Sequence, residues 1–438
     1  MPASPVATKA VRLMTAALWT LAAAVGLAGE AERARRILSA AGVRGGLVVH
    51  LGCGDGRLTA ALRASDRYLV HGLDADAADV AEARGQLQKL GLYGEISVAR
   101  FDGRHLPYAD NLVNLIVAED RGDVPMEELT RVLAPLGVAY LKQGDAWAKT
   151  VKPWPKNIDE WTHWLHGPDG NAVARDKVAG PPRGMQWIAR PLWSRHHNTV
   201  PSVTAWVSAR GRVFAVVDEA PPGMHGDAPD QWALVARDAF NGILLWRIPL
   251  PEWGWRAWSA DWHCRFTVPT HIPRRLVASG DRLYATLGFN APLSELDAAT
   301  GEVLRTFKGT AFTDEILCHD GLLILAINEG PQEPGRRGKP GDPPVRKAVA
   351  ALDAKSGEML WRTGDYGGLR SKTGSMDRIS HLSMAAGGGQ VFFVDGDALV
   401  SLDLKSGRQV WRAPRPKVPE HPMRYHIRIT DMCSLVYH

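Results

Sequence analysis

The sequence predicts a multidomain chain, in which an α/β domain with a parallel sheet precedes an all-β region of repeated antiparallel sheets. Three observations lead to this prediction. A glycine-rich turn separates strand-like from helix-like segments near the start, an Asp-x-x-x-Gly motif recurs in the second half, and residues 149–200 form a linker rich in Pro, Trp and His. A length of 438 residues suits about two or three domains.

Residues 1–28 are predicted to be a secretory signal peptide or an N-terminal anchor. Lys9 and Arg12 form a basic start, an apolar run follows, and Gly26-Leu27-Ala28 has the small-x-small pattern of a cleavage site. The run is shorter than the about 20 apolar residues of a membrane span. The pattern predicts export to the periplasm or cell envelope. The alternatives are an uncleaved anchor that associates with the membrane, or a helix of a cytoplasmic protein.

Residues 31–148 are predicted to form the α/β domain. Its strands read as continuous apolar runs, and its helices have apolar residues three or four positions apart. Strands are expected over 46–51, 68–73, 95–100, 112–118 and 137–141, and helices over 31–41, 57–64, 77–90 and 126–133. Strands that alternate with helices predict a parallel sheet covered on both faces.

The first strand runs into the turn His50-Leu51-Gly52-Cys53-Gly54-Asp55-Gly56. Glycines at alternate positions let the backbone approach a ligand where a Cβ would collide, and the free N–H groups of a following helix favour an anionic or polar group. Asp74 ends the second strand, where a carboxylate can accept both hydroxyls of a ribose. Asp102 follows the third strand. Because ligands bind at the carboxyl ends of parallel strands, these residues predict a nucleotide-like cofactor.

This constellation resembles class I S-adenosylmethionine-dependent methyltransferases over about residues 44–142. The turn matches their acid-x-Gly-x-Gly-x-Gly motif, Asp74 the acid of their second strand, and Asp102 the acid that contacts adenine, followed by Leu106-Pro107-Tyr108. The stretch Arg131 to Gly137 matches the one before their fifth strand. The resemblance implies a Rossmann-like fold and an S-adenosylmethionine site formed by His50, Gly52, Cys53, Gly54, Asp55, Gly56, Asp74 and Asp102.

The chain departs from the methyltransferase pattern in three respects. His50 replaces the usual acid, Asn114 replaces an acidic residue of the fourth strand, and the last two strands of a complete methyltransferase are not evident. Glu119 and Asp120, at the end of the fourth strand, are the candidates for a base that deprotonates the methyl acceptor, and a solvated loop is the alternative. The sulfonium cofactor is already activated, so alignment of the acceptor is the main task of the protein.

The linker contains one pattern that could suggest a metal site. Glu160, His163 and His166 have a spacing compatible with ligands on one face. Because no further fixed ligand can be identified, no metal site is predicted, and the aromatic residues of the segment are expected to pack on the next domain. The four cysteines include no Cys-x-x-Cys pair, so the sequence also gives no zinc or redox motif.

Residues 201–438 repeat one motif, an apolar strand followed by Asp-x-x-x-Gly and a second strand. The aspartate can accept hydrogen bonds from the turn amides, and the glycine supplies a positive φ. The aspartates are Asp238, Asp297, Asp353 and Asp403. Apolar strands precede these turns at 213–217, 283–287, 322–327 and 391–394. A four-stranded unit at this period is typical of a propeller blade.

The motif resembles the repeat of pyrroloquinoline-quinone-type propellers, in which a tryptophan docks between neighbouring blades. Trp246, Trp361 and Trp411 match that tryptophan, and Arg305 stands in its place in the second copy. About four blades are visible and roughly seven or eight usually close this type, which predicts an incomplete propeller. Pyrroloquinoline quinone itself is not expected, because no adjacent cysteine pair and no calcium constellation can be identified. Propellers of outer-membrane assembly use the same repeat without the cofactor.

The sequence therefore predicts a methyltransferase-like protein whose propeller recruits a protein or small-molecule substrate. A non-catalytic envelope scaffold with a degenerate methyltransferase domain and a quinone-dependent dehydrogenase are the alternatives. Export conflicts with methylation, because S-adenosylmethionine is made in the cytosol. Nucleic acid is not an expected partner, since 52 basic residues face 47 acidic ones and no dense basic run occurs.

Overall fold

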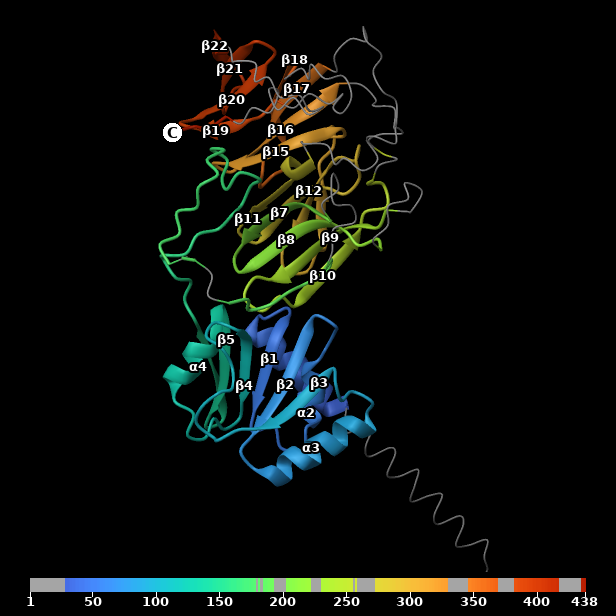
Figure 1. Ribbon diagram of the computed structural model, residues 1–438, viewed down its shortest axis with the longest axis vertical. Helices are drawn as coiled ribbons and strands as arrows, with labels where there is room; N and C mark the ends of the chain where they lie inside the picture. Colours follow the sequence, from blue (N-terminus) through green and yellow to red (C-terminus); the bar gives the residue numbers. More distant parts are fainter. Residues whose placement is uncertain are drawn as a thin grey trace, which may run out of the picture. The chain divides into compact units, whose positions relative to one another are not determined.

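The computed structural model describes residues 28–178, 180–181, 184–192, 202–221, 230–254, 257, 272–329, 346–368, 382–416 and 435–438. The chain divides into unit 1, residues 1–155 with 243–245, and unit 2, the remainder (Figure 1). Apart from Ala28, the expected signal peptide lies outside the described residues. No helix among the described residues is both long and apolar enough to cross a membrane.

Unit 1 is built on a six-stranded sheet in the order β3-β2-β1-β4-β5-β6. Strands β1 to β5 are parallel, as the sequence predicts, and β6 runs antiparallel to β5. Residues 28–41 are helical and precede β1. The labelled elements are β1 (Gly46–Leu51), α2 (Arg57–Leu62), β2 (Tyr68–Asp74), α3 (Ala77–Lys89), β3 (Ile96–Arg100), β4 (Val113–Ala118), α4 (Met126–Val132), β5 (Leu133–Gln143) and β6 (Ala146–Val151).

Each face of this sheet buries its own apolar cluster. On one face Val48, Val70 and Leu115 pack with helix 28–41, α2 and α3. On the other face Val49 and Ile116 pack with α4. Because successive strand residues point to opposite faces, both sets of apolar side chains leave water, which is the reason for the continuous apolar runs in the sequence. The sheet is thus covered on both faces, as predicted.

Two features at the β5 edge differ from the sequence prediction. Strand β5 begins at Leu133, directly after α4, where the pattern predicted a start at Gly137. Leu136 has a φ of 65°, and the pairing register with β4 shifts between Val113 and Leu115, so the early part of β5 is irregular. Strand β6 was not predicted because it is an edge strand, partly or fully exposed along its length, and so carries little apolar pattern.

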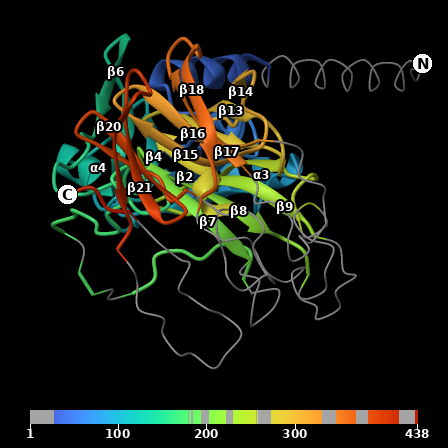
Figure 2. The ribbon, with the colours of Figure 1, turned by 90° about the horizontal axis from the view of Figure 1, so that it is seen from above.

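Unit 2 contains four antiparallel sheets, each with four strands in chain order (Figures 1 and 2). Sheet 1 comprises β7 (Val203–Ala209), β8 (Arg212–Asp218), β9 (Trp232–Asp238) and β10 (Leu244–Pro249). Sheet 2 follows the short helix η1 (Ile272–Arg275) and comprises β11 (Leu276–Ser279), β12 (Arg282–Thr286), β13 (Leu293–Asp297) and β14 (Val303–Thr306). Sheet 3 comprises β15 (Thr313–His319), β16 (Leu322–Glu329), β17 (Arg346–Asp353) and β18 (Met359–Tyr366). Sheet 4 comprises β19 (Ala385–Gly387), β20 (Gln390–Asp395), β21 (Ala398–Asp403) and β22 (Gln409–Pro414).

The first strands of the four sheets are neighbours in the order β7, β11, β15 and β19. Among the described residues no contact of similar extent joins β19 back to β7, so the sheets form no closed ring there. Residues 161–168 of the linker, here called the strap, run along these first strands and bond to each sheet. The bonds join Trp161 to Ser208, Thr162 to Ala278, His163 to Cys318 and Pro168 to Ala386.

The Asp-x-x-x-Gly turns connect the third and fourth strands of each sheet, as predicted. In the first copy the Oδ1 atom of Asp238 accepts hydrogen bonds from the amides of Phe240 at 2.8 Å and Asn241 at 2.9 Å. The turn glycines have φ values of 73° (Gly242), 75° (Gly301), 80° (Gly357) and 68° (Gly407). This left-handed conformation strains any residue with a Cβ, so glycine is required there.

We expect Gly407→Ala to destabilise the protein more than Gly389→Ala. Both glycines have a positive φ, and the strain of a Cβ there costs about 1–2 kcal/mol. A Cβ on Gly407 would also lie 2.5 Å from the Trp361 ring, whereas nothing lies within 4 Å of one on Gly389. Overpacking adds about 1–3 kcal/mol, which urea unfolding would measure. Equal losses would show that the ring contact contributes nothing.

Candidate functional site

The glycine turn after β1 leaves open space beside its backbone. Gly52, Gly54 and Gly56 have φ values of 66°, 49° and 79°. A Cβ on Gly56 would lie 2.9 Å from the Cβ of Ala83 in α3, whereas nothing lies within 4 Å of one on Gly54. Gly56 therefore permits close packing and Gly54 faces free space. The sequence led us to expect that the N-terminus of α2 would help to bind an anionic group. Because α2 has only six residues, that contribution is small, and the open space is formed by the glycine turn itself.

Asp74 lies at the end of β2, next to the glycine turn, where the sequence placed it. Its Oδ2 accepts the amide of Gly54 at 3.1 Å, and its Oδ1 accepts the amide of Asp76 at 3.1 Å. The amide of Gly52 also donates to the carbonyl of Leu73 at 2.9 Å, which ties the turn to β2. Each oxygen of a carboxylate has more than one lone pair, so Asp74 can still accept hydroxyl groups of a ligand. The residues present thus fit a ribose.

His50 is buried beneath the turn and is neutral. Its side chain is 3% exposed, and its Nδ1 lies 2.8 Å from the hydroxyl of Thr59. Burial lowers the pKa of His50 to about 4, and the nearby Glu119 carboxylate opposes this shift only in part. The position that holds an acid in methyltransferases therefore carries no charge at neutral pH.

The Asp102 carboxylate accepts hydrogen bonds from residues of the loop in which it lies. Its Oδ1 accepts the amides of Arg104 at 2.8 Å and His105 at 2.7 Å, and its Oδ2 lies 2.7 Å from the Nδ1 of His105. The two amides and the His105 ring hold the pKa of Asp102 well below its usual range. Asp102 is thus an ionised, exposed group that organises the loop after β3, with less free acceptor capacity than Asp74.

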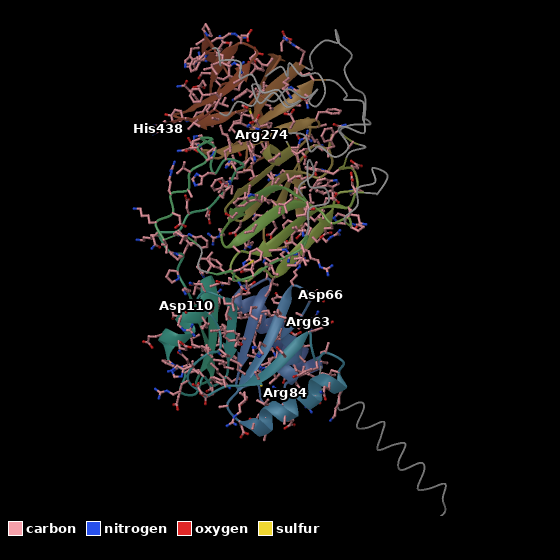
Figure 3. All side chains as sticks on the ribbon, viewed as in Figure 1. Arg63, Asp66, Arg84, Asp110, Arg274 and His438 are labelled. Carbon is pink, nitrogen blue, oxygen red and sulfur yellow. The ribbon has the colours of Figure 1, made fainter. Side chains whose placement is uncertain are left out.

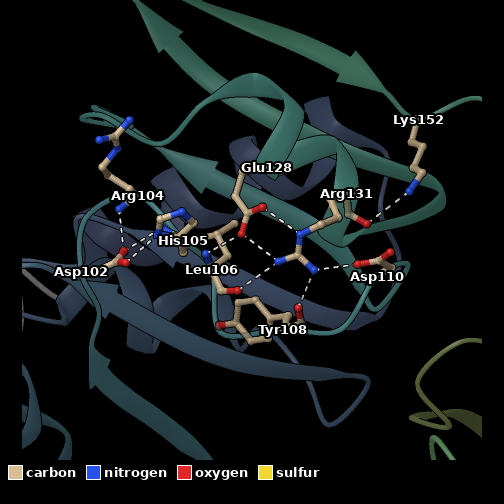
Figure 4. A network of polar contacts seen from close by, with 9 residues as sticks. All are labelled: Asp102, Arg104, His105, Leu106, Tyr108, Asp110, Glu128, Arg131 and Lys152. Atoms are coloured by element: carbon tan, nitrogen blue, oxygen red, sulfur yellow. Dashed lines mark hydrogen bonds and ion pairs between the residues drawn. The ribbon is translucent and has the colours of Figure 1, made fainter.

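Arg131 fixes the same loop from α4 (Figure 4). Its guanidinium donates to the carbonyls of Leu106 at 3.2 Å and Tyr108 at 2.9 Å, and to Asp110 at 2.7 Å. Glu128 accepts from Arg131 at 2.7 and 2.8 Å and from the Leu106 amide at 2.7 Å. Sequence reasoning did not identify Glu128, although a glutamate three residues before an arginine on a helix is a recognisable pair. In this chain the arginine of the stretch Arg131 to Gly137 thus holds the loop after β3 in place.

Glu119 and Asp120, the candidate bases, both have partners within the protein, although Asp120 is exposed and accepts only one amide. Arg33 of helix 28–41 forms an ion pair with Glu119, and the Nζ of Lys142 lies 3.8 Å from it. Asp120 accepts the amide of Gly122 at 2.9 Å. Arg33 was not foreseen, because its pairing depends on where helix 28–41 lies relative to β4.

The remaining reactive side chains are also committed to structure. Burial raises the pKa of the Cys53 thiol to about 12, so this residue of the turn serves as a small side chain. In the strap, His163 accepts the Cys318 amide at 3.0 Å, and His166 lies 2.7 Å from Asp159. Glu160 accepts the amide of Arg210 at 2.6 Å. Within the described segments, no group of three or more His, Cys, Asp or Glu side chains could hold a metal ion.

Family models match two parts of the chain. Residues 48–137 match a model described as a methyltransferase domain. Residues 233–432 match a model described as the outer membrane protein assembly factor BamB. The chain thus combines a methyltransferase-type α/β domain with repeats of the pyrroloquinoline-quinone type, as predicted. A comparison with curated protein sequences finds no match.

Solved structures resemble unit 1 at low identity. A SAM-dependent methyltransferase from Aquifex aeolicus is 23% identical, with 26% of this chain and 67% of that one covered and a TM-score of 0.23. A geranyl diphosphate C-methyltransferase from Streptomyces coelicolor, solved with S-adenosyl-L-homocysteine, is 18% identical, with coverages of 26% and 45% and a TM-score of 0.24. The [4+2]-cyclase SpnF is 20% identical, with coverages of 25% and 43% and a TM-score of 0.24. The chain spans about half the length of most such structures.

We expect His50 to make the protein less stable in mild acid. The folded group has a pKa of about 4 and the unfolded one about 6.5, so the unfolded chain binds the extra proton between these values. The contribution of His50 to the free energy of unfolding is therefore complete above pH 6.5. It falls by about 3 kcal/mol as the pH drops towards 4. Urea unfolding of wild type and His50→Asn across this range would measure it. The same pH slope in both proteins would refute the assignment.

We expect Arg131→Met to loosen residues 102–110 without unfolding the sheet. The variant keeps an apolar side chain of similar length. It loses the hydrogen bonds to two backbone carbonyls and the ion pairs with the carboxylates of Glu128 and Asp110. One charged hydrogen bond contributes about 1.5–3 kcal/mol, so amide exchange in this loop should accelerate roughly tenfold or more. Hydrogen exchange by mass spectrometry would show it. Arg104→Met, at an exposed side chain, is the control and should leave the exchange unchanged.

Proposed function

We propose that unit 1 binds S-adenosylmethionine and acts as a methyltransferase. The observation that carries this proposal is the Asp74 carboxylate, fixed by the amides of Gly54 and Asp76 beside the open side of the glycine turn. Backbone curvature leaves room for the nucleoside, and the carboxylate retains acceptor capacity for its ribose hydroxyls. The family match over residues 48–137 supports the same assignment.

The residues of the site bind and align more than they transfer protons. When bound, the cofactor supplies a methyl group already activated by the sulfonium. Gly52, Gly54 and Asp74 would hold the nucleoside, and Arg131 keeps the loop that carries Asp102 in place. Glu119 is paired with Arg33 and Lys142, so Asp120, which is exposed and accepts one amide, is the better placed of the two candidate bases. Recruitment of the methyl acceptor by the repeat region remains part of the proposal.

A second candidate is a non-catalytic scaffold, and His50 is the observation that favours it. A neutral imidazole bonded to Thr59 replaces the acid that supports the cofactor in the resembling family. Export, which the N-terminal pattern predicts, would also separate unit 1 from a cytosolic methyl donor. The repeat region adds no observation that favours a quinone-dependent dehydrogenase. The two remaining candidates differ in whether unit 1 binds the cofactor.

We expect Asp74→Asn to raise the Kd for S-adenosylmethionine at least roughly tenfold. An amide nitrogen at this position would face the N–H groups of Gly54 or Asp76, and the charged acceptor for the ribose would be lost. A hydrogen bond to a charged group contributes about 1.5–3 kcal/mol, and 1.4 kcal/mol is a factor of ten. Isothermal titration with S-adenosylmethionine and S-adenosylhomocysteine would measure both affinities.

Asp66→Asn is the matched control for this titration. Asp66 pairs with Arg63 at 2.8 Å near the start of β2, far along the strand from Asp74, and its side chain is 95% exposed (Figure 3). Its replacement should leave the Kd unchanged. Folded wild-type protein that binds neither compound would favour the scaffold. Binding that survives Asp74→Asn unchanged would place the cofactor elsewhere.

A further inference from the structure

The two carboxylate oxygens of Asp102 have different kinds of partner (Figure 4). Its Oδ1 accepts the backbone amides of Arg104 at 2.8 Å and His105 at 2.7 Å. Its Oδ2 lies 2.7 Å from the Nδ1 of the His105 ring, and no other group of the described residues bonds to it. The backbone therefore fixes one oxygen, whereas a side chain alone occupies the other.

The His105 ring is the donor in this contact. The amides of His105 and Arg104, together with the ring, hold the pKa of Asp102 well below its usual range. Its carboxylate is thus ionised and can only accept hydrogen bonds, so the proton between the two groups belongs to Nδ1 of His105. Three of the roughly four acceptor sites of the carboxylate are in use. The site that is left lies on the oxygen that His105 already contacts.

The loop around Asp102 is fixed, whereas the His105 ring is free to move. Arg131 donates to the carbonyl of Leu106 at 3.2 Å, and Glu128 accepts the amide of Leu106 at 2.7 Å, so α4 holds the loop in place. The His105 side chain is 79% exposed, and among the described residues its ring bonds to Asp102 alone. The ring can therefore leave Asp102 without any movement of the loop.

Asp102 lies one strand away from the carboxylate that we propose for the ribose. Strands β2 and β3 are parallel with Asp74 opposite Arg100, and the amide of Phe101 donates to the carbonyl of Asp74 at 3.0 Å. Asp102 follows at the same edge of the sheet, where neighbouring strands are about 4.8 Å apart. Besides its ribose hydroxyls, the nucleoside of the cofactor has one strong donor, the amino group of the base. An ionised acceptor at this distance suits that group.

We propose, on the basis of the proposed function, that His105 regulates the cofactor site of unit 1: its ring occupies Asp102 in the free protein and leaves it when the amino group of the base binds there. The contact is autoinhibitory, because the base has to approach the oxygen that the ring already occupies. Exposed pairs of this kind are weak, so the contact raises the Kd of the cofactor by about twofold to fivefold.

His105→Ala tests the proposal directly, since it removes the ring and keeps the backbone amide that bonds to Oδ1 of Asp102. We expect its Kd for S-adenosylhomocysteine to be about twofold to fivefold lower than that of wild type, measured by isothermal titration. Arg104→Ala is the matched control. It removes an exposed cation from the next position and also keeps its amide, but the Arg104 side chain forms no ion pair with Asp102, so the Kd should stay at the wild-type value.

A second ligand separates competition at Asp102 from a general change of the site. S-inosylhomocysteine has a carbonyl oxygen in place of the amino group of adenine, so it offers no donor at that position. Its Kd should be the same for wild type and His105→Ala. An equal gain in affinity for both ligands would mean that His105 acts on the whole site, and would overturn the proposal.

Two other results would also overturn it. An unchanged Kd of His105→Ala for S-adenosylhomocysteine would show that the ring does not compete, and a higher Kd would show that the ring supports the base. Either result leaves the proposed function intact, since wild type still binds the ligand. If neither wild type nor His105→Ala binds S-adenosylhomocysteine, the proposed function and this inference both fail.

The nitrogen NMR signal of the His105 ring gives an independent readout. Saturation with S-adenosylhomocysteine should shift the Nδ1 signal as its bond to Asp102 breaks, whereas S-inosylhomocysteine should leave the signal in place. An Nδ1 signal that stays constant with S-adenosylhomocysteine bound would show that the ring remains on Asp102, and would contradict the proposal.

Discussion

Both units depend on glycines held in the left-handed backbone conformation. In unit 1, Gly54 and Gly56 turn the chain sharply between β1 and α2, and the turn leaves a space that no Cβ occupies. In unit 2, each Asp-x-x-x-Gly turn places a glycine beneath a side chain of the preceding sheet or of the linker. A residue with a Cβ would be strained in both places and would fill the space that the partner needs.

The candidate site of unit 1 combines an open glycine turn with a carboxylate that the backbone holds in place. Asp74 is positioned by two amides and remains able to accept hydroxyl groups. Glu119 forms an ion pair with Arg33, and burial keeps His50 neutral. Such a site suits an activated cofactor, which needs orientation rather than acid or base catalysis.

Local patterns were sufficient for most elements of unit 1 and for the place of Asp74 at the end of β2. The parallel strands of unit 1 are buried on both faces, so their apolar runs stood out, and the bounds of β1 were predicted without error. Strand β6 was missed because an exposed edge strand leaves little pattern. The pair of Glu119 with Arg33 and the bond from Arg131 to the Tyr108 carbonyl could not be read from the chain, because these partners lie far apart in the sequence. The pair of Arg131 with Glu128, three residues away, could have been.

The sequence by itself determined which backbone turns form and which side chains they carry, since glycine conformation, aspartate capping and strand periodicity are local properties. Only the tertiary structure decided which of those side chains are satisfied. It showed that Arg305 stands where a tryptophan is expected and donates to the Lys355 carbonyl, that Trp187 of the linker donates to the Ala239 carbonyl, and that the Trp411 side chain is 40% exposed. These outcomes depend on long-range packing between sheets, which the local pattern of a repeated motif does not specify.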